Sequence, residues 1–399
     1  MEMKKMVAEM QWQQIYALIN GLSESYDQVW RQRQRKIGTA FLIVFLMKLR
    51  FSRAQSGYQI VIDEIWDAWR QSGVVPPQEK PVAASSVCEA RKKLDPQAIY
   101  EINREVVDSF LTLYDDEFRW KGRRLFVVDG SKISLPPQLK SNGFGGLNPG
   151  MHYPKGLLSV LMHAATGMAV DVLLDSKGDE RTAAAKHLKV LMPDDVVIYD
   201  RGYFGFNLLA QHIRYGIDAI FRVPLTGSAK AIQDFATDPT KPIDKIVSIT
   251  TPDSVRKSLH IPRAKARKTS LKVRLIRYTI NEKDYIIATT IFDERISPNE
   301  FAAIYHERWS IEEHFKASKS ILAMEIFHSK SISGVLQEIY ATELLITLSR
   351  IIAAQAAISN KQKDSLEKLR ETNAQIFFQA LKSMIPRRNT INRSSQRHR

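Results

Sequence analysis

The chain has 399 residues, of which 44% are hydrophobic and 25% are charged, and its formal net charge is +15. This balance is typical of a globular protein with two or three cored domains, and it excludes the disordered, collagen-like and coiled-coil classes. The excess of Lys and Arg over Asp and Glu indicates a polyanionic partner.

Cysteine usage and apolar runs indicate the compartment. Cys88 is the single cysteine, so no internal disulfide forms, and without a CxxC motif or a Cys/His cluster we expect no zinc site. The longest apolar run, residues 40–47, is far shorter than the roughly 20 residues of a membrane span and predicts a buried helix. The first residues, MEMKKMVAEMQ, resemble no secretory signal. We therefore expect a cytoplasmic protein with no membrane partner.

The first part of the chain, residues 1–118, lacks strand alternation and predicts a helical domain. Ser85 or Ser86 is the expected N-cap of a short helix that continues to Leu94. A basic cluster would project from this helix, formed by Arg91, Lys92 and Lys93. Two interpretations stay open, a solvated helix face and a helix-turn-helix-like contact with DNA.

The texture changes to mixed α/β over residues 119–223. Apolar runs predict strands at 125–128, 157–163, 168–174, 196–199 and 218–223, with helices at 180–191 and 204–215. The order β-β-β-α-β-α-β is typical of an RNase H-like core, although ferredoxin-like and doubly wound sheets give partly similar sequences. We expect the RNase H-like arrangement.

A β-rich insertion is expected over residues 224–297, where short alternating runs replace the α/β pattern. Between Arg256 and Arg277 the chain has nine Lys or Arg and no acidic residue. Alternating basic residues in a strand line one face of a sheet. They favour a surface that follows DNA phosphates over the alternative of a solvated edge.

Two aspartates follow apolar strands. Asp129 follows the apolar residues of Leu-Phe-Val-Val-Asp-Gly, and Asp200 follows those of Val-Val-Ile-Tyr-Asp-Arg-Gly-Tyr. Each aspartate alone is typical of a turn at a strand end. If the two strands are neighbours, however, both carboxylates reach one cleft beside the strand ends.

A helix with a readable start follows in residues 298–330. Ser297 as N-cap, Pro298 at the first helical position and Glu300 at the third form a capping box. At 100° per residue an apolar stripe contains Ile304, Ile311, Phe315 and Leu322, and the adjoining polar stripe contains Tyr305, Arg308, Glu312 and Lys319. The polar stripe predicts either a cleft lining or a plain intrahelical Arg308–Glu312 pair. Residues 331–399 are expected to form C-terminal helices and a basic tail.

The spacing Tyr305-x2-Arg308-x3-Glu312-x6-Lys319 resembles the YREK signature of bacterial insertion-sequence transposases with a DDE triad. The order of Asp129, Asp200 and Glu312, the last after a β-rich insertion, is similar to that family's order. The resemblance covers about residues 120–325 and implies that these three carboxylates are catalytic and hold metal. It also implies that Tyr305, Arg308 and Lys319 hold the DNA backbone at the transposon end, with Arg201 as a further phosphate contact.

The chemistry of the residues agrees with this resemblance. Two Mg²⁺ ions, for which Mn²⁺ substitutes, can activate the attacking oxygen and stabilise the leaving one, and carboxylates are their preferred ligands. The resemblance implies cut-and-paste cleavage and strand transfer through a hairpin on double-stranded DNA, both terminal repeats and target. It also implies that the helical residues 1–118 form a DNA-binding domain. A homodimer in the DNA complex and a place at the bacterial nucleoid are implied as well.

One departure concerns the hairpin step, in which a tryptophan of the insertion commonly holds a flipped base in the family. The sequence has no tryptophan between Trp120 and Trp309, so Tyr278, Tyr285 or Phe292 would have to stack the base. Two rival functions stay open. One is a metal-dependent nuclease that joins nothing, and the other is a DNA-binding regulator derived from a transposase that cuts nothing.

Overall fold

The computed structural model describes residues 12–28, 36–51, 57–71, 75–145, 152–224, 229–258, 270–280 and 282–359. The chain divides into two compact units. One comprises Met1–Ala98 with Leu348–Arg399, and the other comprises Ile99–Thr347. The basic tail and the second expected C-terminal helix lie outside the described residues.

The first unit is helical where it is described. Its helices are α2 (Trp12–Gln28), α3 (Thr39–Phe51), α4 (Tyr58–Gln71) and α5 (Ala84–Arg91), together with the end of α14 (Ile332–Ser359). Helix α3 is buried along its length, as its apolar run predicts, and Phe41 packs edge-on against Trp66. The predicted N-cap of α5 was wrong, because Ala83 precedes the helix and makes no side-chain cap.

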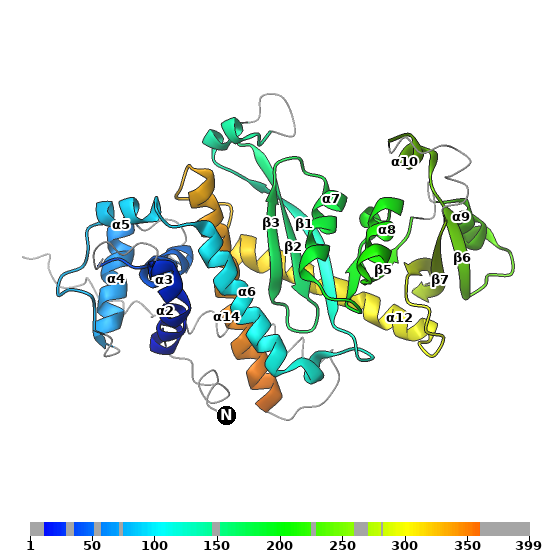
Figure 1. Cartoon of the computed structure of the whole chain (residues 1–399), viewed down its shortest axis with the longest axis horizontal. Coiled ribbons are helices and arrows are strands. Elements are labelled where there is room, and N and C mark those ends of the chain that lie inside the picture. The colour runs from blue at the N-terminus through cyan, green and yellow to red at the C-terminus, as the bar shows by residue number, and fades with distance from the viewer. Residues whose placement is uncertain are drawn as a thin grey trace, which may run out of the picture. The chain divides into compact units, whose positions relative to one another are not determined.

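The second unit is built on a mixed eight-stranded sheet with the order β3-β2-β1-β4-β5-β8-β7-β6 (Figure 1). Its strands are β1 (Leu125–Ser134), β2 (Lys155–His163), β3 (Ala169–Asp175), β4 (Val196–Tyr199), β5 (Asp218–Arg222), β6 (Asp244–Thr250), β7 (Ser270–Ile280) and β8 (Lys283–Thr289). Strand β1 is antiparallel to β2 and parallel to β4, and β4 is parallel to β5. The expected order of the first five strands and their helices is confirmed.

The remaining strands extend this same sheet. Strand β8 pairs with the edge of β5, placing Ile220 opposite Thr289, and β7 and β6 follow in antiparallel register. Two short helices, α9 (Lys230–Thr237) and α10 (Asp253–Ser258), accompany them. The β-rich sequence pattern of residues 224–297 therefore corresponds to strands that widen the core sheet.

The prediction of a phosphate-binding face on these strands is wrong for its two best-placed arginines. Arg274 is 3% exposed and binds the Asp244 carboxylate, while Arg277 is 8% exposed and binds Asp284 at 3.2 Å. Both guanidinium groups also donate to backbone carbonyls. Because the partner acids lie on the neighbouring strands, both positive charges are neutralised by ion pairs within the sheet. Residues 259–269 lie outside the described residues.

Helices cover both faces of the sheet, and strand alternation separates their contacts. Leu125 and Val127 of β1 share a core with Phe301 of α12 (Pro298–Tyr305). On the other face Tyr199 of β4 hydrogen-bonds His212 of α8 (Phe206–Tyr215), at 2.9 Å. Helix α7 (Glu180–His187) shares that second face, since the His187 ring contacts Ser159 of β2 at 3.0 Å. Helix α6 (Pro96–Leu113) precedes the sheet.

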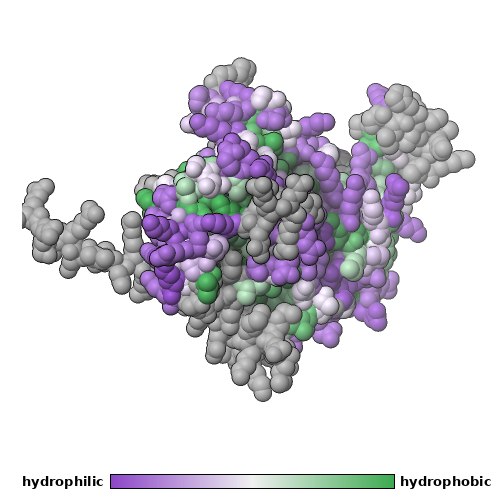
Figure 2. Space-filling view, turned by 60° about the vertical axis from the view of Figure 1, so that its left-hand side comes forward, coloured by the Kyte–Doolittle hydropathy of each residue, from purple (hydrophilic) through white to green (hydrophobic). Residues whose placement is uncertain are grey.

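The surface carries no extended apolar area on the face that Figure 2 shows, where hydrophilic side chains dominate among the described residues. Within the described part of the chain, no helix is long and apolar enough to cross a membrane.

Candidate active site

Asp129 stands where the buried part of β1 ends. Its carboxylate accepts a hydrogen bond from the Gly130 N–H at 2.8 Å and a long one, at 3.5 Å, from the Tyr203 hydroxyl. Burial is the largest influence and raises the pKa of Asp129 to about 6, with the charges of Glu180 and Asp200 adding to the rise and Arg308 opposing it. A carboxylate in such surroundings gains most from a cation.

Asp200 follows β4 at the same edge of the sheet. Because β4 runs parallel to β1, with Ile198 opposite Val127, Asp200 after the end of β4 is level with Asp129 in the middle of β1. The Arg222 guanidinium lies 3.2 Å from the Asp200 carboxylate, and the Tyr305 hydroxyl donates to it at 3.4 Å. The two aspartates thus lie on neighbouring strands, as expected, but the prediction that Asp129 ends its strand was wrong, because β1 continues to Ser134 in its pairing with β2.

The helical segment after β8 carries the third expected carboxylate. The capping box at its start is confirmed, because Ser297 accepts from the Glu300 N–H and Glu300 accepts from the Ser297 N–H. The segment continues as a 3-10 turn (His306–Trp309), α13 (Ser310–Lys316) and a π turn (Ala317–Ile321). The even 100° spacing assumed for the polar stripe is therefore broken twice, although the expected apolar stripe is buried: Ile304, Ile311, Phe315 and Leu322.

Tyr305 and Arg308 reach the aspartates from this segment. Burial raises the pKa of the Tyr305 phenol and the Asp200 charge adds to the rise, so the hydroxyl is a neutral donor. Arg308 is 8% exposed and binds Glu312 through its Nη2 atom at 2.7 Å. Its positive charge acts on both Asp129 and Asp200. Arg308 therefore links all three expected carboxylates electrostatically.

Glu312 itself is 57% exposed on its side chain and is held by Arg308, which is the intrahelical pair left open above. Within the described residues, no three His, Cys, Asp or Glu side chains stand close enough together to hold a metal ion. The donor set nevertheless fits a hard divalent cation at Asp129 and Asp200. For a third ligand, Glu312 would have to leave Arg308.

Lys319 contacts the first strand. Its Nζ donates to the Lys132 carbonyl of β1 at 3.0 Å and lies 4.0 Å from the Glu325 carboxylate. Arg201 is exposed in a 3-10 turn (Arg201–Tyr203) directly after Asp200. Arg201 is thus next to Asp200 in the chain, and Lys319 contacts the strand that carries Asp129. Their contact with DNA stays a prediction.

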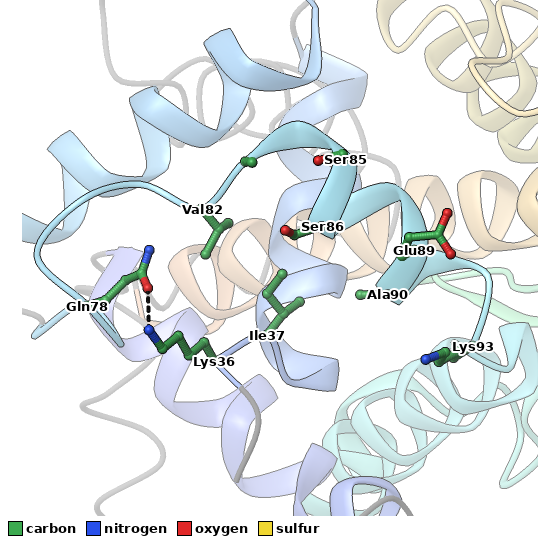
Figure 3. A pocket seen from close by; sticks show the side chains of 10 residues that line it. Lys36, Ile37, Gln78, Val82, Ser85, Ser86, Glu89, Ala90 and Lys93 are labelled. Carbon is green, nitrogen blue, oxygen red and sulfur yellow. Dashed lines mark hydrogen bonds between the residues drawn. The ribbon is translucent and has the colours of Figure 1, made fainter. Parts of the chain in front are cut away.

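The expected basic cluster in the first unit is only partly exposed. Arg91 is 6% exposed and hydrogen-bonds the Tyr58 hydroxyl, so the prediction that it projects outward was wrong. Lys92 is exposed and pairs with Glu89 at 2.6 Å. Lys93 lies at the rim of a hollow of about 660 Å³, across from Lys36, which donates to Gln78 at 2.9 Å (Figure 3).

Of the rings expected to stack a base, two are engaged with each other. Tyr278 and Tyr285 stack with centroids 5.5 Å apart and an interplanar angle of 21°. Phe292 is 41% exposed. Its ring is the one of the three that is most open to a base.

Three residues near the aspartates were not predicted from the sequence as site residues: Glu180, Tyr203 and Arg222. Glu180 begins α7 after the N-cap Asp179, and a Cβ at Gly130 would lie 3.3 Å from the Glu180 Cγ. Tyr203 belongs to the Asp-Arg-Gly-Tyr run, which was a usable signal. Arg222 ends β5, and only the parallel pairing of β4 with β5 brings it beside Asp200.

This fold and site define a class: a mixed α/β protein in which aspartates of two neighbouring parallel strands lie near an arginine and a tyrosine from one helical segment. The family described as Transposase DDE domain matches residues 120–348, more than half of the chain. The chain therefore belongs to the DDE transposase family.

Two further comparisons add little. A search of the curated proteins finds no match. Among solved structures, the chain is similar to the piggyBac transposase in a cryo-EM synaptic complex with hairpin DNA, with 10% identity and a TM-score of 0.42. The similarity covers 97% of this chain and 82% of that one, and it is too distant to define the fold.

Proposed function

We propose that this protein binds the ends of a bacterial insertion sequence and catalyses their metal-dependent cleavage and transfer into a target DNA. The observation that carries the proposal is the shared edge of β1 and β4, where Asp129 and Asp200 meet Arg308 and Tyr305. Membership of the DDE transposase family supports it. We also propose that the core is RNase H-like, which the order and pairing of β1 to β5 support.

In this proposal Asp129, Asp200 and Glu312 are the catalytic carboxylates and hold two Mg²⁺ ions, which Mn²⁺ can replace. The bound ions supply an activated oxygen nucleophile and stabilise the leaving oxygen. Arg308 has two roles, since its guanidinium neutralises the acidic edge without DNA and can turn to a phosphate when DNA binds. Tyr305 holds Asp200 through its neutral hydroxyl.

The contacts to DNA follow from the exposed cations. Lys319 and Arg201 would hold the backbone of the transposon end close to the aspartates, and Lys92 and Lys93 would contact DNA from the helical first unit. Arg91 is excluded from this role by its burial. We further propose a homodimer in the DNA complex, because joining two ends needs two active sites, and action at the nucleoid of the bacterial cytoplasm. The hairpin intermediate belongs to the same proposal.

The test is an assay of cleavage and joining on duplexes taken from the flanks of the encoding gene. We expect wild-type protein to cut and join in Mg²⁺ and to do neither in EDTA. Asp129→Ala, Asp200→Ala and Glu312→Ala should each bind the ends and cut nothing. Lys245→Ala, a change at an exposed lysine of β6, is the matched control and should cut normally.

The other outcomes of this assay would favour other functions or another third carboxylate. Cleavage without joined products would favour the nuclease, and binding without cleavage would favour the regulator. Cleavage by the Glu312→Ala variant would mean that the Arg308–Glu312 pair is only a helix contact and that another acid completes the site, for which Glu180, whose charge acts on Asp129, is the candidate.

A further inference from the structure

A groove lies between α7 and α8 on the face of the sheet opposite α12. Its volume is about 570 Å³, and it is bordered by Arg181, Lys186 and Lys189 on one side and by Asn207, Gln211 and Tyr215 on the other. The two helices stand beside each other in Figure 1. None of these residues takes part in the contacts of Tyr305, Arg308 or Lys319 described above.

The groove begins at the acidic edge. The Arg181 Nε donates to the Gly202 carbonyl at 2.8 Å, two residues after Asp200, and the Arg181 Nη1 would lie 3.5 Å from a Cβ at Gly205. Helix α7 starts at Glu180, whose charge acts on Asp129. Since α7 and α8 both begin at this edge, the groove leads away from the aspartates for about 12 Å, the length of an eight-residue helix.

Its charge fits a polyanion. Three cations border it, and its one acid, Asp179, is occupied as the N-cap of α7 by the backbone N–H groups of Arg181 and Thr182. Lys186 lies 2.8 Å from Asp175, whereas Lys189 projects as an exposed side chain beyond the end of α7. Amide and phenol groups on the α8 side supply neutral donors of the kind that contact phosphates.

We propose that this groove binds the backbone of the target duplex, the DNA into which the cut end is joined. The inference rests on the proposed function. The end held at the α12 side and the target held at the α7 and α8 side would then approach the aspartates from opposite faces of one sheet. Joining needs two DNA molecules at one set of carboxylates, and a groove that starts at those carboxylates provides the second position.

The test compares full-length variants in two assays. The first is the binding of a fluorescein-labelled duplex of unrelated sequence, measured by anisotropy at several salt concentrations. Lys189→Glu should weaken this binding about tenfold and make the salt dependence shallower by about one released ion. Lys189→Arg should bind like wild type. Lys230→Glu, the same charge reversal at an exposed lysine of α9, should also leave it unchanged.

The second assay starts from pre-cleaved ends and measures joining to an unrelated target. Lys189→Glu should lose joining about tenfold while its cleavage of uncut ends stays within about twofold of wild type. Unchanged duplex binding by Lys189→Glu would overturn the inference, as would an equal loss of cleavage and joining. A wild-type protein that cuts no end would refute the proposed function instead, and the binding comparison would still decide what the groove binds.

Discussion

Asp129 is arranged for function at a cost to stability. Its carboxylate is largely removed from water, directly after the fully buried part of β1, and faces the negative charges of Glu180 and Asp200. The Gly130 N–H, the charge of Arg308 and the long hydrogen bond from the Tyr203 hydroxyl favour its ionised form. Ordinary packing would avoid such a site, and a bound divalent cation would relieve it.

Replacing this carboxylate should therefore stabilise the protein. The folded pKa of Asp129, about 6, lies above the unfolded value of 3.8. The folded state holds its proton more tightly, so stability falls as the pH rises from about 4 through 6. At pH 7.5 without divalent ions, Asp129→Asn should raise the free energy of unfolding by about 1–2 kcal/mol, after allowance for partial exposure.

Urea unfolding at pH 7.5 and pH 4 measures this difference. The advantage of Asp129→Asn should vanish at pH 4, where the wild-type carboxyl is protonated in the fold. Added Mg²⁺ should stabilise the wild type and leave the variant unchanged, because a ligand stabilises only the state that binds it. A variant less stable than wild type at pH 7.5 would show that Asp129 has a structural partner that its surroundings do not reveal.

At the scale of elements, local sequence signals were sufficient for much of the fold. Apolar runs bounded by turns predicted β1 to β5, and the Ser297 capping box fixed the start of α12. The pairing of β8 with β5 joins positions about 70 residues apart, and no local pattern encodes it. For the same reason the partners of Arg274 and Arg91 were hidden, since Asp244 and Tyr58 lie 30 and 33 residues away.

The site followed the same rule. Asp129, Asp200 and Glu312 each follow or occupy an element that the sequence announces, so their positions could be predicted. The Arg308–Glu312 contact was one of two readings of the helix, and only the packing of that helix against β1 and β4 makes Arg308 face the aspartates too. The place of Arg222 depends on strand order, and that of Glu180 on the packing of α7 against β1 and β2.

A buried polar network connects α7 to its neighbours. His187 bonds Ser159 of β2 at 3.0 Å and Asp171 of β3 at 2.8 Å, and Asp171 accepts from Tyr100 of α6 at 2.7 Å. Burial would raise the pKa of Asp171, but the bonds from His187 and Tyr100 outweigh it and lower the pKa. The serine, histidine and aspartate resemble a hydrolytic triad, yet Ser159 and His187 are 0% exposed and meet no substrate.

This network should therefore act on stability. We expect His187→Ala to lower the free energy of unfolding by about 3 kcal/mol, because it leaves the Asp171 carboxylate and the Ser159 hydroxyl buried with partners missing. Thermal and urea unfolding measure the loss. Lys189→Ala, two residues along at an exposed position, is the control and should change the free energy of unfolding by less than about 0.5 kcal/mol. A loss of activity in His187→Ala with full stability would contradict the structural role.

At the scale of the whole molecule, the net charge is +15, but not every cation is free to contact DNA. Several arginines form ion pairs within the fold instead, as Arg274 does with Asp244 and Arg124 with Asp195. Among the described residues, the cations that we propose to contact DNA ends are the exposed Lys92, Lys93 and Arg201, together with Lys319 and the Arg308 that can leave Glu312. Phosphate contacts from these five proposed positions predict how strongly salt should weaken end binding.

Each neutralised phosphate contributes about 0.9 to the slope of log K against log salt, so about five contacts predict a slope near −4.5 for a duplex that carries one transposon end. Fluorescence titrations between low and physiological salt measure it. Lys93→Ala should make the slope shallower by about 1, whereas Arg91→Ala should leave it unchanged and lower stability instead, because that guanidinium is buried against Tyr58. A slope near −1 for the wild type would mean that its excess charge does not serve the ends, and the polyanion would then have to be sought at the target groove.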